Sequence, residues 1–156
     1  MDSILRRGIE LYNAGEFFEA HEVLEEAWTP ERGPRRLFLQ SLIHVAVGAY
    51  HRSRGNPVGA CRQLRKALRK MEAYLPECEG VDTARLYRDT RRLLEGIEAD
   101  PVSAGRFEER GDGAGGVLDH AVASHRAHTA NGDPHLPAEG FAAADAFIQI
   151  VHRDVD

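Results

Sequence analysis

Glycine and proline divide the first hundred residues into five segments, and within each segment the apolar residues recur at the three- and four-residue spacing of an α-helix. Asp2 or Ser3 can cap the first helix, and Pro34 suits the first turn of the third helix. These breaks and spacings predict helices over residues 3–12, 16–28, 34–53, 57–74 and 83–99. The expected fold class is therefore all-α, a compact helical bundle of about five helices.

The third of these segments is the most apolar part of the chain, from Leu37 to Tyr50. A helix that is apolar around most of its circumference must be covered on several sides. We expect it to be the central helix of the bundle.

Two pairs of segments share a pattern of small and apolar residues when the chain is compared with itself at an offset of 40 residues. Gly15, Ala20, Leu24 and Ala27 in the first pair correspond to Gly55, Ala60, Leu64 and Ala67 in the second. Glycine permits a tight turn between two helices, and alanine permits their close approach. With Gly8 and Tyr12 in front of it, the first copy resembles a tetratricopeptide helix pair, although arrays of such pairs need about three units. The pattern predicts two tetratricopeptide-like helical hairpins within one bundle.

The last third of the chain differs in composition from the rest. Residues 1–100 contain 16 Lys or Arg and 16 Asp or Glu, whereas residues 101–156 contain 4 and 9 and carry the whole net charge of −5. Glycines crowd the stretch 101–116, a short helix is expected over 117–130, and an Ala-rich segment covers 137–152. We expect a helical core domain over 1–100. An irregular, acidic C-terminal extension over 101–156 would pack on this core or trail from it.

Composition excludes several classes of protein. With 42% apolar and 29% charged residues, the chain is neither a disordered tail nor a disulfide scaffold. It has no apolar stretch of about 18 residues and its N-terminus lacks an apolar signal core, so a cytoplasmic protein without a membrane partner is expected. Cys61 and Cys78 lack CxxC spacing and are expected to be free thiols.

Polar side chains interrupt the apolar stripes of two consecutive expected helices. The stripe within 16–28 contains Phe17, His21, Leu24 and Trp28, with Glu25 beside it. The stripe within 34–53 contains Leu37, Gln40, His44, Val47 and His51. If the two faces meet, His21, Glu25, Gln40, His44 and His51 converge in a buried polar seam.

Three interpretations of this polar seam are open. Burying such groups without partners costs about 1–3 kcal/mol each, so they can form a structural hydrogen-bond network. Alternatively, they can form a ligand-binding or catalytic pocket without metal. His21 and Glu25 would act there with His44 and His51, because a carboxylate four residues from an imidazole can orient it and raise its basicity. The third interpretation is a divalent metal site, but neither HExxH nor paired ExxH motifs occur, so no metal ligand and no cofactor is assigned.

The same residues carry a resemblance to a known family. The stretch 12–28, the stretch 38–47, and the later His51, 55–56 and 59–60 resemble the Domain of Unknown Function 309 family. The resemblance covers residues 8–75 and implies a small all-helical protein, in a family whose activity is not established.

Position by position, the family pattern picks out a set of six residues. They are His21, Glu22, Glu25, Trp28, Gln40 and His51, of which Glu22, Trp28 and Gln40 are candidates for binding a ligand. This chain departs from the pattern at Ser41, where glycine is expected, and at His44, where glutamine is expected. A position that accepts glutamine is not an obligatory metal ligand, so the second departure weakens the metal interpretation.

Basic residues gather on two expected helix faces, over 62–70 and 85–92. They could meet nucleic-acid phosphates, but few aromatic residues accompany them and acidic residues over 16–26 offer a matching surface. Solvated faces or a charge match within or between subunits is the favoured interpretation. The tail histidines His120, His125, His128 and His135 are expected to be incidental surface residues.

The sequence favours a binding or interaction module that contains the buried polar seam. The alternative is a hydrolase or lyase, acting through His21, Glu25, His44 and His51 on a small acidic or phosphorylated ligand. Nucleic-acid binding is the weaker alternative. A homodimer is also expected, because the third helix is so apolar and the tail needs a docking surface.

Overall fold

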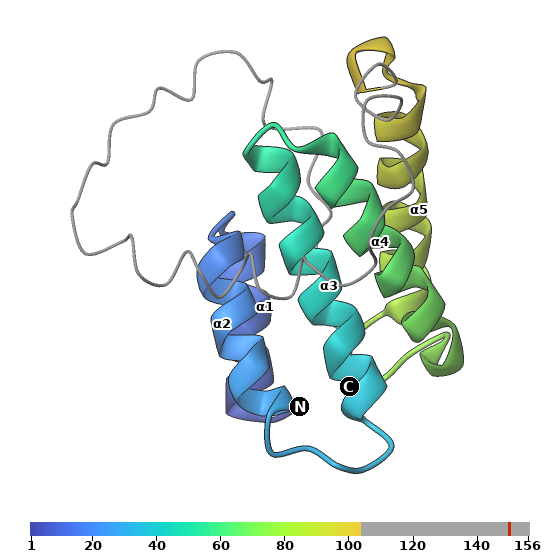
Figure 1. Ribbon diagram of the computed structural model, residues 1–156. Coiled ribbons are helices and arrows are strands. Elements are labelled where there is room, and N and C mark those ends of the chain that lie inside the picture. The colour runs from blue at the N-terminus through green and yellow to red at the C-terminus, as the bar shows by residue number, and fades with distance from the viewer. Residues whose placement is uncertain (104–149, 151–156) are drawn as a thin grey trace, which may run out of the picture.

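The computed structural model describes residues 1–103 and residue 150, and in this part of the chain the fold is all-α, as expected. The elements are α1 (Ser3–Asn13), α2 (Phe17–Trp28), α3 (Arg36–Ser53), α4 (Pro57–Met71), the short 3₁₀ helix η1 (Glu72–Tyr74) and α5 (Thr83–Ala99). Figure 1 shows α3 between α2 and α4. The short helix expected over 117–130 lies outside the described residues, and so does the Ala-rich segment 137–152 apart from residue 150.

Helix boundaries agree closely with the sequence pattern, except at the end of α4, where the 3₁₀ helix η1 takes the last three residues expected to be α-helical, and at the start of α3. Pro34 was expected in the first turn of that helix, but α3 begins at Arg36. The N–H of Arg36 donates to the carbonyl of Gly33, which forms a tight turn instead of helix. The carbonyl of Pro34 accepts a hydrogen bond from the hydroxyl of Tyr74. The proline therefore belongs to the turn that precedes the helix.

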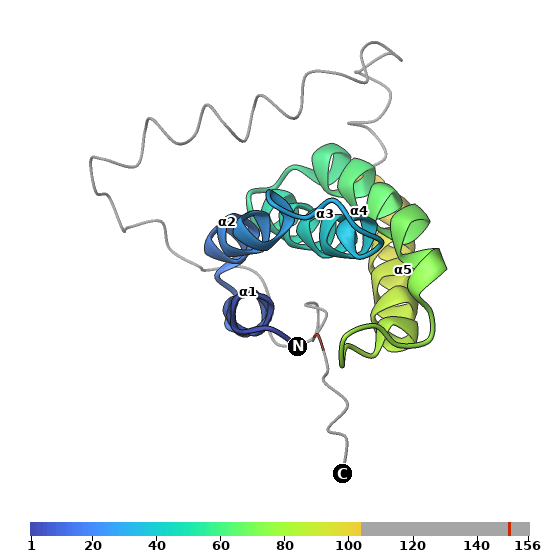
Figure 2. The same ribbon diagram turned by 90° about the horizontal axis from the view of Figure 1, so that it is seen from below.

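Helices that follow one another in the chain pack against one another, and together they form an arc with α1 at one end and α5 at the other (Figure 2). Residues Ser41 to Ala49 of α3 are all buried, together with Phe38 and Leu39. This confirms that the third segment is the central helix. Its apolar excess is covered within the chain, so it no longer argues for a homodimer.

The hairpins α1–α2 and α3–α4 have the same close approach at positions 40 residues apart. A Cβ atom added at Gly8 would lie 2.8 Å from Leu24 Cδ2, and one added at Gly48 would lie 2.8 Å from Leu64 Cδ2. Both hairpins turn at a glycine with positive φ, 84° at Gly15 and 69° at Gly55. The sequence pattern had placed Gly8 in front of the first copy only; Gly48 takes the corresponding position in the second hairpin.

Asp2 caps α1 and joins it to the turn before α3. Its Oδ1 accepts a hydrogen bond from the N–H of Leu5 at 2.7 Å, and its Oδ2 lies 2.7 Å from Arg35 Nη2. The pKa of Asp2 lies below its ordinary value of 3.8, chiefly because of the Leu5 N–H and then because of Arg35.

Replacing Asp2 by Ala should lower the free energy of unfolding by about 0.5–2 kcal/mol, the usual value of a helix cap. Asp2→Asn keeps the oxygen acceptor and should lower the free energy of unfolding at pH 7 by less than Asp2→Ala does. Because the folded pKa is depressed, the charge of Asp2 stabilises fully above pH 3.8 and this contribution is lost as the pH falls through the lower folded value. Urea unfolding at pH 7 and below pH 4, with Ser3→Ala as control, measures both effects. An Asn variant with the same acid sensitivity as the wild type would contradict this assignment.

The two cysteines are free thiols, as expected. Cys61 is buried in α4, and burial raises the pKa of its thiol to about 11. A thiol with so high a pKa stays protonated near neutral pH and reacts slowly. None of the helices in the described part of the chain is both long enough and apolar enough to cross a membrane.

Candidate functional site

His21 pairs with Glu25 one turn further along α2. His21 is buried, whereas the side chain of Glu25 is 50% exposed. The imidazole Nε2 lies 2.9 Å from the carboxylate Oε1. The other ring nitrogen, Nδ1, is buried and has no hydrogen-bond partner in residues 1–103 and 150. The expected pair is therefore present, with its carboxylate at the surface.

His44 points toward α4. Its Nδ1 lies 2.7 Å from Oε1 of Gln63, and both side chains are buried. Sequence reasoning did not select Gln63, but a signal for it was present. Gln63 lies three residues after Ala60 and four before Ala67, on the apolar stripe of its helix. A polar residue at such a position needs a partner on the neighbouring helix.

His51 lies at the corner between α3 and α4. Its Nδ1 is 3.2 Å from Nδ2 of Asn56, and its ring is 6.3 Å from the ring of Tyr50, measured between centroids. The Oδ1 of Asn56 accepts the N–H of Gly59 and so caps α4. His51 therefore supports the residue that starts the next helix.

Trp28 is the last residue of α2, and the guanidinium of Arg36 lies over its indole ring. The guanidinium carbon of Arg36 lies 3.9 Å from the ring centroid, and Arg36 Nη1 donates to the carbonyl of Trp28 at 2.9 Å. Glu22 and Gln40, the other candidates for ligand binding, are half-buried. Trp28 thus helps to join α2 to α3.

The contacts within the predicted polar seam go in different directions. They join His21 to Glu25 within α2, and they direct His44 and His51 toward α4 and the turn before it. Convergence of all five seam residues on one ligand stays a prediction. In the part of the chain that the structure describes, no group of three or more His, Cys, Asp or Glu side chains is placed to hold a metal ion.

A second polar contact joins two residues that are 137 positions apart in the chain. Asn13, the last residue of α1, donates from Nδ2 to the carbonyl of Ile150 at 3.0 Å. The N–H of Ile150 donates to Oδ1 of Asn13 at 2.9 Å. One carboxamide therefore satisfies both backbone groups of one residue, as a neighbouring β-strand would.

The side chain of Ile150 completes the hydrophobic core. It is 2% exposed and belongs to the same buried apolar cluster as Leu5 and Ile9 of α1. Val81 and Leu86, at the other end of the arc, belong to that cluster too. We call the Asn13 carboxamide together with Leu5, Ile9, Val81 and Leu86 of this cluster the Asn13 site.

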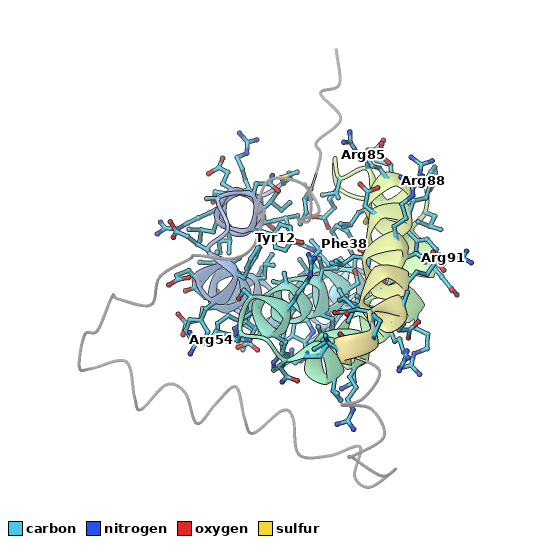
Figure 3. The ribbon with its side chains drawn as sticks, turned by 90° about the horizontal axis from the view of Figure 1, so that it is seen from above. Tyr12, Phe38, Arg54, Arg85, Arg88 and Arg91 are labelled. Carbon is cyan, nitrogen blue, oxygen red and sulfur yellow. The ribbon has the colours of Figure 1, made fainter. Side chains whose placement is uncertain are left out.

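Tyr12 lies next to Asn13 and is also buried. Its ring centroid is 5.2 Å from that of Phe17, and Figure 3 shows it with Phe38 inside the bundle. Its hydroxyl has no hydrogen-bond partner within the described residues. Burial raises the pKa of Tyr12, and the positive charge of Arg52 opposes this shift. A buried polar atom is therefore present beside the Asn13 site.

Sequence reasoning missed the Asn13 site because Asn13 directly follows the first expected helix, over 3–12, where a polar residue is an ordinary signal for the end of a helix. The α-helical period of the surrounding segment describes local structure alone, whereas the partner of Asn13 lies in the C-terminal extension. No spacing rule connects residues so far apart.

The basic residues on the outer face of α5 are partly paired within the chain. Figure 3 shows Arg85, Arg88 and Arg91 along this face. Arg85 lies 3.6 Å from Asp89, Arg91 lies 3.0 Å from Glu95, and Arg65 of α4 pairs with Glu98. Exposed pairs such as these contribute little to stability.

Comparison with known proteins shows what this chain is similar to. Residues 5–63 match the family described as "Domain of unknown function (DUF309)", which confirms the resemblance seen in the sequence. The chain is also 32% identical over 93 residues to the uncharacterized protein YpuF of Bacillus subtilis (strain 168). The aligned part covers 58% of this chain and 53% of YpuF, so the chain spans about half the length of that relative.

Proposed function

We propose that this chain is a helical binding module that recognises an extended polypeptide segment through the Asn13 site. The observation that carries the proposal is the double hydrogen bond between the Asn13 carboxamide and the backbone of Ile150. A side chain that pairs with both N–H and C=O reads the extended backbone and not a particular sequence. The ligand class is therefore a polypeptide strand.

The apolar part of the site selects the side chain that the strand must carry. Ile150 is almost completely buried, and burying an isoleucine side chain stabilises by about 1.5–3 kcal/mol. Each backbone hydrogen bond adds about 0.5–1.5 kcal/mol net. The preferred ligand thus has a branched aliphatic residue at the position that pairs with Asn13.

The two hairpins support a binding role over a catalytic one. Their shared close approach, at Gly8 and at Gly48 40 residues later, supports a repeated structural unit. Repeated helical hairpins present extended surfaces to partners. The hydrolase or lyase alternative would need the three seam histidines on one ligand, and their hydrogen bonds go to different regions. A homodimer stays a prediction.

The proposal is tested with a fluorescent peptide that has the sequence of residues 145–156. The protein is the full chain carrying Ile150→Asp, so that its own segment does not compete. We expect saturable binding by fluorescence anisotropy. The same peptide with Asp at its Ile150 position should bind more weakly by about tenfold or more, because it lacks the buried side chain.

Asn13→Ala, added to the same chain, should weaken binding by about 5- to 150-fold, which corresponds to two lost hydrogen bonds. Ser53→Ala is the matched control, since Ser53 lies 40 residues after Asn13 at the end of α3. No saturable binding, or equal binding of the two peptides, would refute the proposed function.

A further inference from the structure

We propose that Ile150 is a ligand built into the chain, which occupies the Asn13 site and excludes partner strands from it. This inference rests on the proposed function and adds a mode of regulation to it. The site would be closed by default, and a partner would bind only by displacing the chain's own segment.

The hydrogen bonds of Asn13 make the two occupants mutually exclusive. Both the Nδ2 donor and the Oδ1 acceptor are engaged by the backbone of Ile150. A second strand cannot form the same pair of bonds while these remain. Backbone pairing with Asn13 is therefore available to one strand at a time.

The buried side chain of Ile150 also excludes a second ligand, because it fills the space that the ligand would need. Ile150 is 2% exposed and lies in a cluster with Leu5, Ile9, Val81 and Leu86. Interiors are close-packed, so a second aliphatic side chain cannot enter beside it. The partner's residue must take the place of Ile150.

Covalent attachment favours the chain's own segment over a free strand. Residues 104–149 connect Ile150 to the end of the helical core. A tethered ligand competes at a local concentration that can reach the order of 1 mM. A free peptide with a micromolar dissociation constant would then bind the wild-type chain at least about tenfold more weakly than it binds an unoccupied site.

The test compares three full-length chains with the labelled peptide of residues 145–156: the wild type, Ile150→Asp, and Val102→Asp. Val102 is 71% exposed, so its substitution introduces the same charge without emptying the site. We expect Ile150→Asp to bind the peptide at least about tenfold more tightly than the wild type does. The Val102→Asp chain should bind like the wild type.

The outcomes separate the two proposals. Equal, tight binding by the wild type and Ile150→Asp would overturn the built-in ligand and leave the proposed function intact. Absence of binding to every chain would overturn both. Tighter binding by Val102→Asp as well as Ile150→Asp would show an effect of charge and would also overturn the built-in ligand.

A measurement on the unmodified chain guards against misfolding of the Ile150→Asp variant. The N–H of Ile150 should exchange with deuterium at least about tenfold more slowly in the wild-type chain than in the free peptide, because it donates to Asn13. Excess unlabelled peptide, added to the ¹⁵N-labelled chain, should speed this exchange. An exchange rate equal to that of the free peptide would overturn the inference.

Discussion

Replacing Phe38 by Ala should lower the free energy of unfolding by about 3–5 kcal/mol. Phe38 is fully buried in the central helix α3, in the cluster that includes residues from α1, α2 and α5. Its ring centroid lies 5.7 Å from that of Tyr74, whose hydroxyl donates to Pro34. The substitution removes buried aromatic surface and leaves a cavity where several elements meet.

Urea unfolding followed by circular dichroism measures this loss. Leu37→Ala is the matched control, because Leu37 is the preceding residue of the same helix and is 50% exposed. It should change the free energy of unfolding by about 0.5 kcal/mol or less. Similar losses for the two variants would show that α3 is not the central helix.

Leu24→Ala should lower the free energy of unfolding by about 2–5 kcal/mol, and part of this loss should disappear in a chain that also carries Gly8→Ala. The side chain of Leu24 fills the space in which a Cβ at residue 8 would sit, 2.8 Å away. Gly8→Ala alone should therefore cost about 1–3 kcal/mol by overpacking. When Leu24 is also Ala, the new methyl group has room, so the double variant should lose less than the sum.

The same comparison of the wild type, the two single variants and the double variant can be made at Gly48 and Leu64, where the contact has the same length. We expect the same sign of coupling there. Gly96→Ala in α5 is the control, because a Cβ there would meet nothing within 4 Å. This variant should raise the free energy of unfolding by about 0.4–1 kcal/mol. Additive losses at both hairpins would contradict the close approach of their helices.

Local patterns predicted the helical core well. The spacing of apolar residues, together with glycine and proline, located all five long helices, and Asp2, Asn56 and Asp82 each cap one with an oxygen. These signals act within a few residues, so they can be read directly from the chain. Helix α3 starts two residues later than expected, after a turn closed by the Arg36 N–H and the Gly33 carbonyl. The Pro34 carbonyl in this turn accepts a hydrogen bond from Tyr74, a residue too distant in sequence for a local pattern to include.

The candidate site was less predictable for a physical reason. Helical spacing placed Glu25 beside His21, because residues four apart share a face. It could not show that His44 would turn toward Gln63, since that choice depends on how α3 and α4 pack. Sequence patterns could not predict the pairing of Asn13 with Ile150, because it depends on tertiary contact alone.

The most direct test of backbone recognition by Asn13 uses a peptide of residues 145–156 that is N-methylated at its Ile150 position. Methylation removes the N–H that donates to Asn13 Oδ1 and leaves the side chain unchanged. Its effect is measured by calorimetry in two chains, Ile150→Asp and Ile150→Asp with Asn13→Ala, so that any general effect of methylation cancels. The account predicts that methylation weakens binding by about 2- to 13-fold more in the chain that retains Asn13, as expected for one hydrogen bond. An equal effect of methylation in both chains would contradict it.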